Sequence, residues 1–170
     1  MRIGLGIPGR PELPSSAVVP GWLSDVLSLG PPAGGGPGNI TTGINFTVSS
    51  PQNCTGIRAC WSSINAVAIP VTLSLWHVGP NYLIASEVVT VLNGVIQTTG
   101  AFGSHLLSPG NSYAVSTYNP SLYDGYIANP FSLPRSYPLY DVLNAYSYEL
   151  TYGANYLSSN AYCAYVEPVL

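Results

Sequence analysis

The sequence has 170 residues, of which only 6 % are charged, and its net charge is −3. Its four basic residues are all arginines, so the chain lacks the clustered cationic side chains that nucleic-acid binding requires. No run of about 18 uninterrupted apolar residues is present, which argues against insertion into a membrane. The length allows one domain of ordinary size with an appendage.

A surface with so few charges, covered by Ser, Thr, Asn and Tyr, gives little repulsion between close neighbours. This favours a subunit of an assembly, including a homo-oligomer, or an extracellular adhesive module. The first residues do not form the apolar core of a secretory signal, because Gly and Pro interrupt "IGLGIPGRPELP". A protein that ends outside the cell is then expected to leave it by another route, such as lysis.

Residues 1–29 are expected to form an extended N-terminal arm. Within this arm, "PGWLSDVLSLG" predicts about two helical turns that stop at Gly30. A helix this short is unstable alone, so its apolar side chains must dock either on the main domain or on a partner. The predicted docking residues are Trp22, Leu23, Val26, Leu27 and Leu29.

Residues 30–38 read "GPPAGGGPG" and contain only Gly, Pro and Ala. Fully extended, they span up to about 30 Å. They predict a spacer between the arm and a domain over residues 39–170. If the arm packs back on its own domain, the spacer is a long loop instead.

From residue 39 the pattern becomes that of short β-strands separated by turns. Apolar and polar side chains alternate in "ITTGINFTV", "CTGIRACW" and "VTLSLWHV", and three further strands are predicted in "SYAVSTY", "AYSYELTY" and "AYCAYVEPVL". Asn93-Gly94, between "EVVTVL" and "VIQTTG", predicts a two-residue hairpin turn. Together these elements predict an all-β fold, an antiparallel β-sandwich preceded by the arm.

Several of these stretches resemble a bacterial domain family of unknown function. They are "GINFTVSSPQNCTGIRACW", "VTLSLWHVGPNYLIASEVVTV", "LLSPGNSYAVSTY" and "YDGYIAN". The resemblance covers about residues 40–128 and, loosely, the last strand. It implies a jelly-roll-like sandwich of the kind appended to large secreted proteins, often beside sugar-related domains, and similar to modules of phage virion proteins. Ala59 and Cys60 replace the family's usual aromatic pair, and Glu167 stands at its acidic position.

The resemblance assigns no catalytic residues, and the motifs of the chain add none. "GLGIPG" matches a dinucleotide-binding fingerprint but lacks the preceding strand and following helix, so we interpret it as a coincidence. His77 and His105 have no companions at metal-ligand spacing. No pattern pairs the acids as glycosidase carboxylates. The acids in the predicted sandwich are Glu87, Asp124, Asp141, Glu149 and Glu167. We expect no enzyme activity, no cofactor and no metal.

The three cysteines are interpreted as buried free thiols. Cys54 and Cys60 lie six positions apart, too far to bridge within one strand. Cys163 could meet one of them only if their strands are neighbours.

Residues 119–144 predict a long excursion at one end of the sandwich, and eleven of the thirteen tyrosines follow residue 117. Exposed tyrosines suit contacts with a protein neighbour or stacking on a sugar ring, whereas half-buried strand tyrosines need no ligand. The candidate contact residues are Tyr118, Tyr123, Tyr126, Tyr137 and Tyr140.

These observations predict a non-enzymatic structural component of a virion: a phage head-decoration, head-fibre or minor tail protein that docks by its arm. Its partners would be other virion proteins of the capsid or tail and further copies of the chain. The alternative is an extracellular glycan-binding adhesion module with a cell-surface glycan as its partner. A small hydrolase has only diffuse support.

Overall fold

The computed structural model describes residues 21–30, 40–61, 68–92, 94–119, 127–128, 131–149 and 162–170. At residues 40, 127–128, 146–149 and 162–163 it describes the backbone only. The predictions for residues 1–20, for most of the spacer and for Tyr123 and Tyr126 therefore lie outside the described residues.

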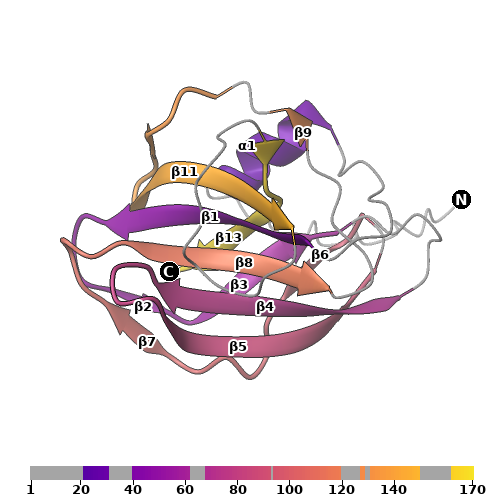
Figure 1. The fold of residues 1–170 in the computed structure, drawn as a ribbon, viewed down its shortest axis with the longest axis horizontal. Helices are drawn as coiled ribbons and strands as arrows, with labels where there is room; N and C mark the ends of the chain where they lie inside the picture. Colours follow the sequence, from indigo (N-terminus) through magenta and orange to yellow (C-terminus); the bar gives the residue numbers. More distant parts are fainter. Residues whose placement is uncertain are drawn as a thin grey trace, which may run out of the picture.

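The fold is an antiparallel β-sandwich, as the sequence predicts (Figure 1). The larger sheet has the strand order β10-β11-β1-β8-β4-β5. Its strands are β10 (Arg135–Ser136), β11 (Tyr140–Glu149), β1 (Ile40–Val48), β8 (Tyr113–Asn119), β4 (Ile69–His77) and β5 (Tyr82–Val91). All of its pairings are antiparallel, which fits a chain that joins its strands by turns and loops.

The second sheet lies behind the larger one in Figure 1 and has the order β13-β3-β6. Its strands are β13 (Val166–Val169), β3 (Gly56–Cys60) and β6 (Ile96–Thr98). Two short pairs complete the described strands, namely β2 (Gln52–Cys54) with β7 (His105–Leu107) and β12 (Tyr162–Cys163) with β9 (Ile127–Ala128).

The hydrophobic core lies between the two sheets and follows the alternation of the sequence. In β3 and β13 the residues that face the core are Ile57, Ala59 and Val166, which are fully buried. Arg58 lies between Ile57 and Ala59 in β3, so its side chain is on the opposite face, where it is half-buried. A period of two thus sorts this strand into an apolar inner face and a face that carries a charge.

Strands β1 and β8 differ from the prediction, because both of their faces are buried. The inward residues Ile44 and Val115 are buried, but so are Thr41, Asn45 and Ser116 on the opposite side. The alternation in "ITTGINFTV" therefore separates an apolar face from a polar face, not a buried face from a solvent face. On the inward face, a hydrogen bond between the hydroxyls of Thr42 and Thr117, 2.9 Å apart, makes the burial of these two polar side chains tolerable.

The predicted hairpin is corrected by the structure. The turn is present, since Gly94 has a φ of +69° and the Val95 amide donates to the Leu92 carbonyl. However, β6 pairs with β3 in the second sheet, and β5 pairs with β4 in the larger sheet. The glycine permits the reversal of the chain, but pairing is decided by which sheet each strand joins.

Helix α1 (Trp22–Leu29) is the short helix that the sequence predicts, and it ends at Gly30, whose φ is +146°. It lies at the β11 side of the sandwich, on the same side as β9 (Figure 1). Trp22, Leu23 and Val26 are part of the same buried core as the sheets. The helix thus packs back on its own sandwich, one of the two surfaces expected from the sequence.

Cys54 and Cys60 are free and buried, as expected. Burial raises the pKa of the Cys54 thiol to about 11. In the described part of the chain, no helix has the length and apolar character needed to cross a membrane.

Candidate binding site at the α1 end of the sandwich

The first turn of α1 is capped by residues far away in the sequence. Its N-cap residue is Gly21, which has no side chain to accept from the free amides of the first turn. The Trp22 amide donates to the Tyr140 hydroxyl at 2.9 Å, and the Leu23 amide donates to Oε2 of Glu167 at 2.9 Å. The carboxylate also meets the positive end of the helix dipole.

Glu167 is the centre of this arrangement, and it is almost completely buried on β13. Its Oε1 accepts from Nε of Arg58, its direct cross-strand neighbour on β3. Its Oε2 accepts from the Leu23 amide and from the Tyr140 hydroxyl at 2.9 Å. We call Glu167, Arg58, Tyr140 and the amides of Trp22 and Leu23 the Glu167 network. Both carboxylate oxygens are occupied, which makes burial of the charge tolerable.

Tyr140 connects the larger sheet to this network. Burial raises the pKa of its phenol well above the ordinary value, and the neighbouring charge of Glu167 raises it further. The hydroxyl therefore stays protonated and donates to the carboxylate while it accepts from the Trp22 amide.

A glycine is required before the helix because the chain passes very close to the network. A Cβ atom at Gly21 would lie 2.6 Å from Oε2 of Glu167 and 3.3 Å from the Tyr140 oxygen. Any side chain there would push the carboxylate away from the helix.

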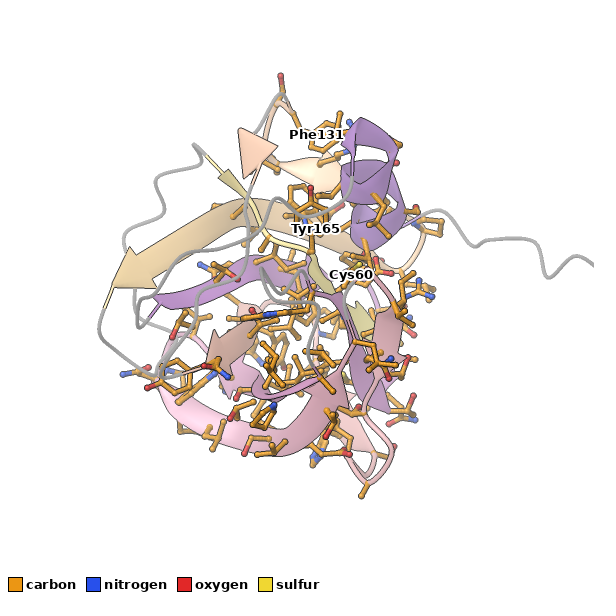
Figure 2. All side chains as sticks on the ribbon, turned by 90° about the vertical axis from the view of Figure 1, so that its right-hand side faces the viewer. Cys60, Phe131 and Tyr165 are labelled. Carbon is orange, nitrogen blue, oxygen red and sulfur yellow. The ribbon has the colours of Figure 1, made fainter. Side chains whose placement is uncertain are left out.

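The Trp22 side chain fixes the helix from within the sandwich. Its Nε1 donates to the carbonyl of Ala164 at 2.7 Å, and its ring meets Phe131 edge-on at 5.6 Å. Figure 2 shows Phe131 beside the helix and Tyr165 below it in the interior. The hydroxyl of Tyr165 donates to the carbonyl of Gly30, so the end of the helix is held as well.

A second polar group, the Arg135 cluster, holds the outer side of the helix. It consists of Asp25, Arg135, Tyr137 and Phe131. Oδ2 of Asp25 accepts from Nε of Arg135 and from the Tyr137 hydroxyl, both at 2.8 Å. The guanidinium also lies 4.6 Å from the centre of the Phe131 ring. Both charged side chains are partly exposed, so this cluster stabilises less than the buried network.

Two cavities lie on either side of the Arg58–Glu167 pair, and we call them together the α1 groove. The first has a volume of about 270 Å³ and is lined by Gly21, Arg58, Pro138, Leu139, Tyr140, Glu167, Pro168, Val169 and Leu170. The second has about 390 Å³ and is lined by Leu23, Ser24, Leu27, Ser28, Arg58, Ile96 and Glu167. The walls are mainly aliphatic, and the side chain of Arg58 is 37 % exposed between them.

The arrangement of this site suits binding. Both oxygens of Glu167 accept hydrogen bonds from within the chain, and its raised pKa keeps the phenol of Tyr140 in its neutral form. Among the described residues, no group of three His, Cys, Asp or Glu could hold a metal ion. Aliphatic walls beside a half-exposed guanidinium suit an apolar segment that carries a hydrogen-bond acceptor.

The structure separates the predicted docking residues of the arm into buried, partly buried and exposed side chains. Trp22, Leu23 and Val26 are buried within this chain, so the prediction that they contact a partner is corrected. Leu27 is partly buried against the core, and Leu29 is 38 % exposed.

Of the three candidate tyrosines that the structure describes, it brings Tyr137 and Tyr140 together and leaves Tyr118 apart. Tyr137 and Tyr140 stack on each other at 5.2 Å, and both hydroxyls are bonded within the α1 end. Tyr118 is half-buried near the opposite end of β1, where it pairs with Thr41, whereas Tyr140 pairs with Val48. Seven residues of extended strand separate the two positions by about 23 Å.

The sequence analysis missed the partners of the two ion pairs. Glu167 stood out only as one of the acids of the predicted sandwich and at the family's acidic position, and Arg58 only as part of the alternating stretch "CTGIRACW". Asp25 and Arg135 gave no signal, because 110 positions separate them. The glycine before a helical pattern is the local sign that another group must cap the helix.

No protein-family model, no curated protein and no solved structure matches this chain. The assignment of a role therefore depends on the geometry described above.

Proposed function

We propose that the protein is a non-enzymatic structural component of a virion, such as a phage head-decoration, head-fibre or minor tail protein. The observation that carries this proposal is the α1 groove, an apolar surface channel in a molecule with very few charges. Such a surface favours stable contact with neighbouring subunits, which for a virion protein are those of the capsid or tail.

The helix has a different part in this proposal from the one expected of a docking arm. Its buried side chains belong to the sandwich, so α1 forms one wall of the groove instead of entering a partner. The exposed aliphatic residues at the groove, Leu139 and Ile96, are then the contacts offered to a neighbour. The Glu167 network keeps that wall in a fixed position.

The test is the presence of the chain in purified particles. Particles from a culture that produces the protein would be banded on a density gradient and analysed by mass spectrometry. We expect the chain to band with the particle proteins. Recovery only in the free protein fraction would overturn the proposal.

The groove is tested with charged variants in the same experiment. Leu139→Asp and Ile96→Asp should lower incorporation, while Leu106→Asp, at an exposed leucine of β7 outside the groove, should not. Circular dichroism of each purified variant checks that the fold is unchanged. Equal incorporation of all three variants would remove the groove from the proposal.

One observation favours the alternative, a glycan-binding module in an extracellular setting. Tyr82 is 51 % exposed, and its ring meets His77 edge-on at 5.3 Å, which leaves an aromatic surface beside the turn that follows β4. Aromatic rings of this kind stack on sugars. A glycan array probed with the intact protein and with Tyr82→Ala would test this alternative, and absence of binding by the intact protein would end it.

A further inference from the structure

Strand β5 forms an open edge of the larger sheet. It is ten residues long and is the last strand in the order, and in Figure 1 it runs along the lower edge of the sheet. One side of β5 pairs with β4 over its whole length. On the other side its backbone groups bond to no described residue. A row of free amides and carbonyls of this length is a template for another strand.

Beyond a register shift at Ile84, near its start, this edge has few of the features that normally prevent such pairing. Natural edges are protected by lysine, by proline or by charges, and β5 contains neither lysine nor proline. Its one charged residue is Glu87, whose carboxylate accepts from the amides of Gly100 and Ala101 at 3.0 and 2.9 Å. The charge is therefore held toward the chain's own loop.

Several of the exposed side chains along β5 are apolar. Val88, in the second half of the strand, is 64 % exposed, and Leu83 and the following Leu92 are exposed as well. A β-branched residue is stabilised by a cross-strand partner, which Val88 has only on the β4 side, where it faces Thr72.

We propose that β5 pairs antiparallel with β5 of a second copy of this chain, about a two-fold axis at Val88. In this register Val88 faces Val88, Ser86 faces Thr90, and Glu87 faces Val89. Branched and hydroxyl side chains thus meet their own kind, and no two like charges face each other. A register centred on Glu87 would place two carboxylates opposite each other and is disfavoured.

A second copy fits this edge better than an unrelated strand for two reasons. Around the axis, "SEVVT" places Val88 opposite itself and Ser86 opposite Thr90, so a single strand supplies both halves of an isologous two-fold contact. The net charge of −3 also produces little repulsion between copies. The two larger sheets would then join into one continuous sheet across the dimer.

The first experiment measures self-association of the full chain by sedimentation velocity over a range of concentrations. We expect a dimer, and we expect Val88→Lys to weaken it by about tenfold or more, because two ammonium groups then face each other on the axis. Leu106→Lys is the matched control, since it places the same charge at an exposed leucine of β7, outside both β5 and the α1 groove. A monomer at every concentration, or a dimer unaffected by Val88→Lys, would overturn the proposal.

A second experiment tests the register. In a Cys163→Ser background, Val88→Cys should form a disulfide between copies under mild oxidation, because facing residues lie about 4.5–5.5 Å apart. Thr90→Cys should not, since two copies of residue 90 would be about 13 Å apart. Efficient crosslinking at residue 90 but not at residue 88 would contradict the axis at Val88. Both results are independent of whether the chain is part of a virion.

Discussion

The two ends of the larger sheet are built in opposite ways. At one end, β10 has only two residues, one of them Arg135, and Pro134 and Pro138 flank it. Helix α1 lies at this end and is bonded to it through Asp25, Arg135 and Tyr140. At the other end, β5 presents ten residues with no proline and no basic side chain.

The difference teaches that the chain closes one edge thoroughly and leaves the other available. Short length, proline, a cation and a covering helix are each recognised ways to prevent pairing at a sheet edge. All four are found at the β10 end. We therefore regard the β5 end as the place for pairing between copies of this chain, and the α1 end, which carries the proposed groove, as the place where packing stabilises the fold. The following predictions test this division.

The largest effect is expected from Trp22→Ala. The substitution leaves a cavity in the core and an unpaired carbonyl at Ala164, and it should lower the free energy of unfolding by about 3–5 kcal/mol. Val88→Ala, at the β5 end, should change it by less than about 0.5 kcal/mol. Denaturant unfolding of both variants measures the contrast, and equal losses would contradict the division.

Glu167→Gln should have the next largest effect. It removes the charge that Arg58 pairs with and weakens the cap on the Leu23 amide, at a cost of about 2 kcal/mol. The matched variant is Glu87→Gln. The Glu87 carboxylate, like that of Glu167, accepts from the backbone, here from the amides of Gly100 and Ala101, but it lies near the surface. Its loss should be clearly smaller. If Glu87→Gln lowers the free energy of unfolding by as much as Glu167→Gln, the two carboxylates stabilise the fold equally, and the α1 end contributes no more than the β5 end.

Tyr140→Phe should cost about 1 kcal/mol at neutral pH and also alter the response to alkali. Burial raises the pKa of Tyr140, and likewise that of Tyr137, above the ordinary value of 10.0. The unfolded chain therefore loses these protons first, so stability is complete below about pH 10 and falls as the pH rises beyond it. Unfolding measured across this range should show a shallower fall for Tyr140→Phe than for the wild type, and an equally steep fall would contradict the role of Tyr140.

Asp25→Asn should have the smallest effect at the α1 end. The Arg135 cluster is partly exposed, so the loss should stay below about 1 kcal/mol and should shrink at high salt. Thermal unfolding at low and high ionic strength measures both features. A loss that is large and independent of salt would show that this cluster, and not the Glu167 network, holds the helix.

The features that the sequence predicted are those with a local cause. The apolar spacing of Trp22, Leu23 and Val26 and the stop at Gly30 predicted α1, and alternation predicted most strands of the larger sheet. The pairing of the strands on either side of Gly94 could not be predicted, because a turn signal specifies a reversal of the chain but not the sheet that the next strand joins. The burial of Thr41 and its neighbours could not be predicted either, because alternation separates the two faces of a strand but does not specify what covers each face.

The candidate site could not be predicted from the sequence for a related reason. Arg58 and Glu167 are 109 positions apart and meet only because β3 and β13 pair. Alternation placed Arg58 on the outer face of its strand, but it carried no information on which residue would face it. The tyrosines were recognised as a group by composition, whereas Tyr137 and Tyr140 act as anchors of the helix.

The cap on α1 also has a consequence for the order of events at the ribosome. The Leu23 amide donates to a carboxylate that lies 144 residues further along the chain. The helix is therefore synthesised before β13, and its cap cannot form until β13 has emerged. A nascent chain that lacks β13 leaves α1 without the contact that holds its first turn, so the emergence of β13 and closure of the core become a single event.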